Sequence, residues 1–421
     1  MGISNYICAA EELNYGEPYM NILFLTLGKL EGFDSHTIYC DLLREFIKNG
    51  HSVYTLSPGN KKQEMPEYDG IECSLAYIDL DTVRGGNNLI KKGFSTIRTG
   101  KAFIKGIKRY YSNIRFDLVI YTTPPITFVS AIEFIKKRDG AKTYLLLKDI
   151  FPQNAVDLGM MATSGPKGLL YNYFRKKEKK LYAISDIIGC MSPANVQYVL
   201  NHNPEVDPNK VEVCPNSIEV IDKSIDAETR VAIRNKYGIP VDKKVFVYGG
   251  NLGKPQGIPF LIECLKTQRN EDICFLIVGD GTEYSKLEVF INSYRPLNVK
   301  LLNRLPKEDY DILVAACDVG MIFLDNRFTI PNFPSRILSY MQAKIPVLAV
   351  TDESTDIGDI IQAGKFGWWC PSTNVSCFIN TISDILSLSN DAFYAFKHNS
   401  FEYLKSNYDV EDNYKRIIET L

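Results

Sequence analysis

The sequence predicts an α/β protein of two doubly wound domains, each with a parallel sheet covered by helices on both faces. Short runs rich in β-branched and aromatic residues alternate with longer helical stretches, as in parallel sheets. This alternation stops in a polar, charged stretch near 217–243 and then starts again. A chain of 421 residues is also too long for one ordinary domain.

In the first half, turn-forming residues or helical segments follow the expected strands. A helix over 35–50 follows the first strand, and Pro58 stops the strand that comes next. We expect the strands of this half at 20–27, 51–58, 116–123, 141–150, 186–192 and 211–216.

The second half repeats the pattern. Its first strand leads into a glycine-rich turn and then into a helix over 258–268. We expect the strands of this half at 245–253, 274–281, 299–305, 318–324 and 345–351.

These elements predict a leader of residues 1–19, a first domain over 20–217 and a second domain over 218–400. A last helix near 400–421 can return to either domain, and it can pack back on the first. In open α/β sheets, ligands sit at the carboxyl ends of the strands. A cleft between two such domains is therefore the expected site.

Composition excludes several classes of function. Lys and Arg total 48 against 50 Asp and Glu, and a generic nucleic-acid binder would be basic. No apolar run reaches the ~18 residues that span a bilayer, and the start lacks the features of a secretory signal. The ten cysteines include no CxxC pair, and the four histidines show no metal-ligand spacing. We expect no metal site, and we interpret the Asp-Leu-Asp triplet at 79–81 as a solvated loop.

The turn YGGNLGKPQG (248–257) follows a strand and precedes a helix. Gly249, Gly250 and Gly253 permit close backbone approach, and a helix N-terminus favours an anion. Lys254 adds positive charge. A tight strand-to-helix turn without a ligand would need the same glycines. The pattern is not GxGxxG, so it does not predict a dinucleotide site.

The segment FPSR (333–336) lies between an expected strand and an expected helix. Pro334 shapes the loop, Ser335 stands where a helix N-cap would be, and Arg336 falls in the first turn. Free N–H groups, a hydroxyl and a guanidinium together suit a diphosphate. An ordinary Ser-capped helix with a solvated Arg336 would explain the same pattern.

Four further residues lie at the ends of expected strands. Gly279 and Asp280 end a strand in small residues where a nucleotide fits, and Arg304 could flank a base or phosphate. Asp149 points toward the expected cleft, where a carboxylate could act as a general base or bind a hydroxyl. The alternatives are a plain turn, a solvated arginine and a capping or salt-bridged aspartate.

Two stretches of the first half are locally basic. Residues 89–111 carry seven basic residues and no acid, and residues 171–180 carry five basic residues and one acid. Basic helices with apolar and aromatic residues can lie on anionic membrane surfaces. A core-facing helix with a solvated basic side is the alternative for both.

Several segments match a known family. FVYGGNLGKPQGIPFLIECL, FLIVGDGTEYSKLE, LLNRLPKEDYDILVAACDVGMIFL and FPSRILSYMQAKIPVLAV resemble GT-B glycosyltransferases of family 4, in order and spacing. MNILFLTLGKLEGFDSHTIYCDLLREFIKNGHSVYTLSP and KDIFPQNAVDLG resemble the acceptor domain of the same family. The resemblance covers nearly all of 20–421. It is closest to bacterial capsule, O-antigen and colanic-acid transferases, some of which use N-acetylfucosamine-type donors.

The sequence departs from that family at two places. Asn251 and Gln256 stand where many members carry Arg and Lys as phosphate partners. The Glu-x7-Glu pair of the family falls at Pro331 and Ser339. The second glutamate of that pair normally holds the nucleotide ribose, and the subgroup with FPSR-like loops shows similar changes.

The resemblance implies sugar transfer from a nucleotide diphosphate donor, UDP-linked, with retained anomeric configuration and with neither a metal nor another cofactor. Lys254 and Arg336 would supply the positive charge, and Asp149 would orient the acceptor or lie near the anomeric carbon. The implied substrate-binding residues are Gly32, Gly250, Asn251, Gly253, Gln256, Gly279, Asp280, Arg304, Pro334, Ser335 and Ser339.

The resemblance also implies an acceptor and a location. The acceptor would be a polyprenyl-diphosphate-linked sugar in bacterial surface polysaccharide biosynthesis. The enzyme would be cytoplasmic and peripheral on the inner face of the cell membrane, held by basic helices at 89–111 and 168–184. No nucleic-acid partner is expected.

Three other functions compete with this interpretation. A UDP-N-acetylglucosamine 2-epimerase-like enzyme of the same fold needs no acceptor, although the scattered histidines disfavour it. A catalytically degenerate partner protein would explain the missing glutamates. A nicotinamide-dependent dehydrogenase would need GxGxxG after the first strand, where the sequence has LTLGKLEGFD.

Overall fold

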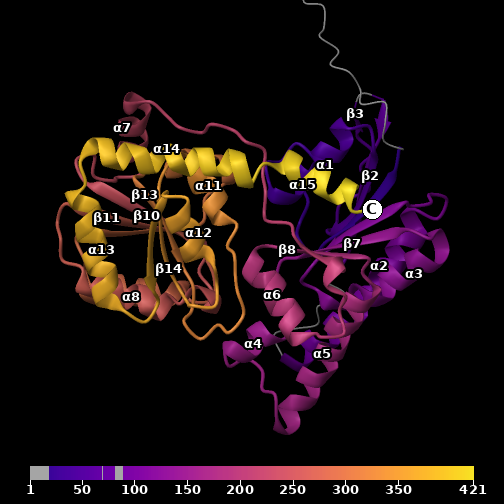
Figure 1. The fold of residues 1–421 in the computed structure, drawn as a ribbon. Coiled ribbons are helices and arrows are strands. Elements are labelled where there is room, and N and C mark those ends of the chain that lie inside the picture. The colour runs from indigo at the N-terminus through magenta and orange to yellow at the C-terminus, as the bar shows by residue number, and fades with distance from the viewer. Residues whose placement is uncertain (1–18, 69, 81–88) are drawn as a thin grey trace, which may run out of the picture.

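The computed structural model describes residues 19–68, 70–80 and 89–421 of the chain. They form two α/β units that lie side by side, each built on a parallel sheet (Figure 1). The two doubly wound, Rossmann-like units expected from the strand–helix alternation are therefore present. The predicted leader falls almost wholly on residues 1–18, and Asp81 of the acidic triplet also lies outside the described residues.

The first sheet has seven parallel strands in the order β5-β2-β1-β6-β7-β8-β9. The strand order reverses between β1 and β6, which pair directly. The strands are β1 (Asn21–Leu25), β2 (Ser52–Pro58), β5 (Ser74–Ile78), β6 (Leu118–Thr122), β7 (Lys142–Leu147), β8 (Ile187–Cys190) and β9 (Val211–Val213). A small antiparallel pair stands beside them, β3 (Glu67–Tyr68) and β4 (Ile71–Glu72).

The second sheet has six parallel strands in the order β12-β11-β10-β13-β14-β15. Its order reverses between β10 and β13, the point where ligands bind in open α/β sheets. The strands are β10 (Lys244–Asn251), β11 (Ile273–Asp280), β12 (Val299–Leu302), β13 (Val319–Phe323), β14 (Val347–Thr351) and β15 (Gly367–Pro371).

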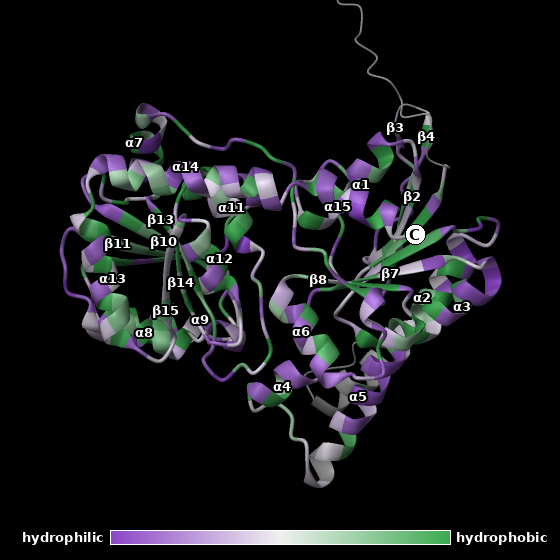
Figure 2. Cartoon of the chain, in the orientation of Figure 1, coloured by the Kyte–Doolittle hydropathy of each residue, from purple (hydrophilic) through white to green (hydrophobic). Residues whose placement is uncertain are grey.

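Helices cover both faces of each sheet, so the strands are buried on both sides and read as apolar runs (Figure 2). Helices α2 (Leu89–Tyr110), α3 (Val129–Asp139), α5 (Gly165–Ile184) and α6 (Pro193–His202) cover one face of the first sheet, and α1 (Ile38–Lys48) covers the other. The short α4 (Gln153–Asp157) follows β7.

The second sheet has α8 (Ile258–Thr267), α9 (Tyr284–Tyr294) and α13 (Val375–Ser387) on one face. Helices α10 (Lys307–Ala315), α11 (Arg336–Gln342), α12 (Ile357–Ala363) and α14 (Asn390–Asn407) cover its other face. Helix α7 (Ala227–Lys236) packs against α10 and lies within the polar stretch that the sequence indicated as a break.

The C-terminal segment consists of two helices instead of the single one expected near 400–421. Helix α14 lies along α11 on the second unit, and α15 (Val410–Glu419) crosses back to pack on α1 (Figure 1). The Tyr414 hydroxyl lies 3.1 Å from Nε2 of the buried His51, and Asn413 donates to the carbonyl of Pro215 at 2.8 Å. The chain therefore passes between the units twice.

The loop between β13 and α11 holds the two units together. Phe328 and Ile330 are buried within the hydrophobic core of the first unit. Asn195 on α6 donates to the carbonyl of Pro331 at 2.9 Å, and the Thr329 amide donates to a carboxylate oxygen of Asp157 at 2.8 Å. These contacts fix the loop that leads into the FPSR segment against the first unit.

Candidate active site

A cavity of about 600 Å³, here called the cleft, lies between the two units. Its first-unit wall comes from the loop before α1, the end of β7 and the segment after β9. Its second-unit wall comes from the turn after β10 and the loop before α11. The cleft therefore lies where the strand order of the second sheet reverses.

The turn after β10 brings bare backbone to the cleft. Gly250 has φ +115°, a conformation that disfavours any residue with a Cβ. Its neighbour in the β10–β11 register is Gly279, where a Cβ would overlap the Gly250 carbonyl. Both glycines are therefore required for this backbone path.

Arg336 is held over the turn by two neighbours. Its guanidinium stacks 4.4 Å from the ring centre of Tyr248, and Nη2 donates to Oε1 of Gln256 at 2.9 Å. The Tyr248 hydroxyl also donates to Gln256 Oε1, at 3.1 Å. Gln256, which stands where many family members carry a lysine, thus orients the arginine. Arg336 is therefore held by protein contacts and is not the solvated side chain of the alternative interpretation.

Four buried polar atoms of residues that line the cleft have no hydrogen-bond partner among the described residues: Nη1 of Arg336, Nδ2 of Asn332, Oδ1 of Asn216 and the hydroxyl oxygen of Tyr310. Asn216 spans the two units, because its Nδ2 donates to the carbonyl of Phe333 at 3.2 Å. Buried polar groups are nearly always hydrogen-bonded. The residues of the cleft wall therefore keep polar groups that the described part of the protein does not satisfy.

The start of α11 differs from the expected cap. Ser335 has helical angles, φ −63° and ψ −14°, and its exposed side chain makes no capping bond. Helix α11 has seven residues, so its dipole is short and the Arg336 guanidinium is the main positive charge here. Likewise, a short 3-10 segment at Lys254–Gln256 separates the glycine turn from α8, so the N-terminus of α8 does not follow the turn directly.

Lys254 lies in another place than expected. It lines a separate cavity of about 680 Å³, here called the second cavity, together with Gly257 and Phe260 from the first turn of α8. Two of its basic residues are already ion-paired, Lys286 with Glu283 and Arg327 with Asp325. The positive charge beside the glycine turn in the cleft therefore comes from Arg336 and not from Lys254.

Asp149 follows β7 as expected, but its carboxylate faces Asn154, which donates to both oxygens at 2.7 and 2.8 Å. Burial raises the pKa of Asp149 to about 6. The preceding residue, Lys148, lines the cleft instead and donates weakly to the carbonyls of Cys214 and Pro215, both at 3.4 Å. Burial lowers the pKa of Lys148.

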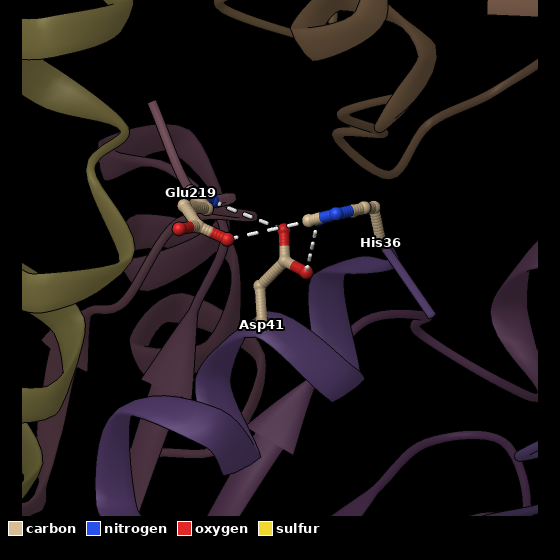
Figure 3. A group of neighbouring side chains, drawn as sticks. All are labelled: His36, Asp41 and Glu219. Carbon is tan, nitrogen blue, oxygen red and sulfur yellow. Dashed lines mark hydrogen bonds and ion pairs between the residues drawn. The ribbon is translucent and has the colours of Figure 1, made fainter. Parts of the chain in front are cut away.

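Three side chains of the first unit and the linker, His36, Asp41 and Glu219, lie close together (Figure 3), and all three contact the guanidinium of Arg44. Arg44 Nη2 donates to Asp41 and to Oε2 of Glu219 at 3.1 Å, and it lies 3.1 Å from Nδ1 of His36. The ligand atoms of His36, Asp41 and Glu219 lie close enough together to hold a metal ion. Because the guanidinium already stands among them as counter-charge, these residues do not fit a cation site.

The structure brings about half of the predicted residues to the cleft. Those that line it are Gly250, Asn251, Gln256, Pro334, Ser335, Arg336 and Ser339. Those that do not are Gly32, Asp149, Gly253, Lys254, Gly279, Asp280 and Arg304.

Of the residues outside the cleft, Asp280 and Arg304 are exposed and lie 3.7 Å apart as an ion pair at the end of β11. Gly32 lies in the loop before α1, and nothing crowds the position of its missing Cβ. Gly253 caps the short 3-10 segment.

Sequence reasoning missed the residues of the first-unit wall. They are His36, Thr37, Tyr39, Asp41, Lys148 and Asn216, joined on the other wall by Lys307, Tyr310 and Asn332. The available signal was position: each of the first group follows the carboxyl end of a strand of the first sheet or begins the next helix.

Two families match the chain. Residues 36–220 match the family described as Glycosyltransferase Family 4, and residues 229–399 match that described as Glycosyl transferases group 1. The chain is 26% identical over 308 residues to glycosyltransferase WbjE of Pseudomonas aeruginosa, covering 72% of this chain and 74% of the relative. It is 22% identical over 315 residues to WcaI of Escherichia coli K12, named for colanic acid biosynthesis, with the same coverage.

Solved structures share the fold. Sucrose-phosphate synthase of Thermosynechococcus elongatus has a TM-score of 0.73 at 13% identity, covering 95% of this chain and 98% of that one. HepE of Anabaena in complex with UDP-glucose has a TM-score of 0.66 at 16% identity, covering 96% and 99%. The two facing Rossmann-like units are the GT-B fold, as the sequence resemblance implied. With a family 4 unit followed by a group 1 unit, the chain belongs to the glycosyltransferases.

Proposed function

We propose that this glycosyltransferase moves a sugar from a UDP-linked donor to a polyprenyl-diphosphate-linked sugar, with retention, in bacterial surface polysaccharide biosynthesis. The name of WcaI supports the pathway class, and the UDP-glucose complex of HepE supports a UDP-linked donor. The observation that carries the proposal is the guanidinium of the cleft-lining Arg336, which lies beside the bare backbone of Gly250 and whose buried Nη1 has no partner among the described residues.

In this proposal the leaving diphosphate lies on the second-unit wall. Arg336 neutralises the charge that develops as the bond from the anomeric carbon to the diphosphate breaks. Tyr248 and Gln256 hold the guanidinium in place beforehand, so little reorganisation is needed during the reaction. Gly250 permits close approach of the phosphate oxygens, because no side chain stands between them and the backbone.

Retention follows if the acceptor attacks from the side of the leaving group. The acceptor hydroxyl oxygen then bonds to the anomeric carbon as the diphosphate departs, and its proton passes to a leaving phosphate oxygen. This step needs neither a protein nucleophile nor a metal. Ser339 lines the cleft at the position of the second family glutamate, where a hydroxyl can still bond a ribose.

The membrane part of the proposal is supported by the N-terminal end of α5. Leu169 and Leu170 are 75% and 41% exposed there, and Met160, 54% exposed, precedes the helix. Lys176 and Lys177 follow on the same helix without a salt bridge to a described residue. Exposed apolar residues next to lysines that form no salt bridge to a described residue suit an anionic lipid surface.

The other basic helix, α2, is a weaker candidate for membrane contact. In its described part, Phe103 and Ile107 are fully buried in the core of the first unit. Lys101, Lys105 and Lys108 form its exposed side. For the described part of this helix, these contacts support the alternative of a core-facing helix with a solvated basic side. No helix among the described residues is both long and apolar enough to cross a bilayer.

The test is a binding screen of the purified chain by ligand-observed NMR. The ligands are UDP, GDP, dTDP, NAD and a panel of UDP-sugars, with Arg336→Ala as the comparison. We expect selective UDP-sugar binding that Arg336→Ala weakens by about tenfold or more. Absence of binding to every nucleotide would overturn the proposal.

Turnover then separates the competing functions. Transfer to lipid-linked acceptors in membrane extracts supports the proposal. Conversion of a UDP-sugar in the absence of any acceptor would instead identify an epimerase-like enzyme. Donor binding without turnover across the whole acceptor panel would identify a degenerate partner, the function favoured by Pro331 and Ser339 in place of two glutamates.

A further inference from the structure

His36 stands at the first-unit wall of the cleft, one residue before the N-cap of α1. Its imidazole is 47% exposed, and its Nδ1 faces Arg44 at 3.1 Å. No hydrogen bond of its Nε2 to a described residue is present. One nitrogen is therefore held by Arg44, and the other makes no hydrogen bond to a described residue in a side chain that lines the cleft.

Arg44 is fixed by contacts on every side. Nη1 donates to the carbonyls of Phe33 and Ser35 at 2.5 and 3.0 Å, and Nη2 donates to Asp41 and Glu219. Asp41 is itself buried and accepts the Glu219 amide N–H at 3.0 Å. Arg44 therefore cannot turn away from His36 without losing several charge-assisted hydrogen bonds.

These contacts set the tautomer of His36. A guanidinium has only donors, so the contact with Arg44 favours an acceptor at Nδ1, with one of the two Nη2 hydrogens shared between Nδ1 and a carboxylate. The oxygens of Asp41 and Glu219 lie 3.7 and 3.6 Å from Nδ1, beyond hydrogen-bond distance. Nδ1 is then unprotonated, and the ring proton of the neutral imidazole sits on Nε2. Arg44 also balances Asp41 and Glu219, whose negative charges would otherwise repel an anion in the cleft.

We infer that His36 donates a hydrogen bond from Nε2 to an oxygen of the nucleotide-diphosphate donor, and that Arg44 is the positioning residue that makes this nitrogen the donor. The inference rests on the proposed function, because it assigns a contact within the same cleft. His36 then supplies a substrate contact from the first unit, where the resemblance implied Gly32, a residue that does not line the cleft.

The tautomer is tested without any ligand. Long-range ¹H–¹⁵N NMR of the ¹⁵N-labelled full chain distinguishes a protonated from an unprotonated ring nitrogen for each of the four histidines. His36→Gln assigns the His36 signals by their loss. We expect the Nε2–H form for His36 in the unmodified protein, and a mixture of tautomers in Arg44→Leu. A predominant Nδ1–H form in the unmodified protein would overturn the inference.

The contact is tested by adding UDP and then UDP-N-acetylglucosamine to the same sample. We expect the His36 Nε2 signal to move in step with saturation, while that of His202, outside the cleft on α6, stays fixed. Nucleotide binding that leaves the His36 signals unmoved would overturn this inference but not the proposed function. Absence of binding to any nucleotide would overturn both.

Affinity gives a second readout. We expect His36→Leu to weaken UDP binding by about tenfold, the effect of losing one hydrogen bond to a charged group. His36→Gln keeps an N–H of similar reach and should recover most of that loss, and His202→Gln is the matched control. Equal UDP affinity of His36→Leu and the unmodified protein would overturn the inference.

Discussion

The cleft and the second cavity are alike in volume but differ in how their polar groups are used. In the second cavity, Lys286 and Arg327 are paired with acids of the same cavity, and one buried polar atom, Ser372 Oγ, is unpartnered. In the cleft, four buried polar atoms on the two walls have no partner among the residues that the structure describes. Uncommitted buried polar groups, more than the number of charges, therefore mark the cavity that is built for a ligand.

Arg336→Ala should have the largest effect on activity, and it tests whether the unpartnered polar groups of the cleft mark the ligand site. We expect the rate of sugar transfer at limiting donor to fall about 100-fold or more, the usual loss when one donor to a developing anion is removed. Arg336→Lys should recover only part of the lost rate. A single ammonium group cannot both donate to Gln256 and reach the ligand, whereas the separate N–H groups of a guanidinium can. Steady-state kinetics, with thermal melting to verify folding, measures both. Full activity of Arg336→Ala would show that the unpartnered polar groups of the cleft do not identify the ligand site.

Asp149→Asn tests a polar group whose carboxylate oxygens already accept hydrogen bonds within the protein, from Asn154. Burial raises the folded-state pKa of Asp149 from 3.8 to about 6, so ionisation opposes folding. Stability is then fully present below pH 3.8 and is lost as the pH rises through 6. Above that pH, the neutral amide should raise the free energy of unfolding by about 1–3 kcal/mol. Asn154 can rotate to accept from the new amide, since its own Oδ1 is unpartnered.

Thermal and denaturant unfolding of the Asp149→Asn variant at pH 3.5 and pH 8 measures this difference. The gain should be present at pH 8 and absent at pH 3.5. A variant that is less stable at pH 8 would show that the ionised carboxylate supports the fold. A loss of transfer activity at unchanged stability would show that Asp149 takes part in the reaction in the cleft, as the sequence resemblance implies.

The fold and the second-unit wall of the cleft could be predicted from the sequence, because both depend on the pattern of residues close together in the chain. Apolar runs fixed most strands to within a few residues, and the glycine turn and Arg336 are adjacent in sequence to strand ends. Strands β5 and β15 were missed, although both are short parallel strands like those that were found. Helix α7 was missed because its polar sequence carries little apolar periodicity.

The first-unit wall was not accessible in the same way. His36 and Glu219 are 183 positions apart, and only the crossing of the linker beside α1 brings them to one guanidinium. Likewise, Lys148 and Asp149 are consecutive, and nothing local decides which of them faces the cleft. Side-chain direction at a strand end depends on neighbours, here Asn154 and the carbonyls after β9.

Lys254→Ala should have the smallest effect and is the sharpest test of the comparison. The sequence resemblance gives Lys254 a role on the diphosphate, whereas the structure places it, exposed, in the second cavity. Across solvent, a single exposed charge is strongly screened. We therefore expect donor affinity to change by less than about threefold, an energy below 1 kcal/mol, and the change to vanish in high salt.

Lys286→Ala is the matched control, since it removes a lysine of the same cavity that is already paired with Glu283. Isothermal titration with UDP at two salt concentrations compares both variants with the unmodified protein. If Lys254→Ala weakened binding as strongly as Arg336→Ala, the 3-10 segment that carries Lys254 would have to turn toward the cleft when the donor binds. The two cavities would then be parts of one site, and the unpartnered Ser372 hydroxyl would belong to it as well.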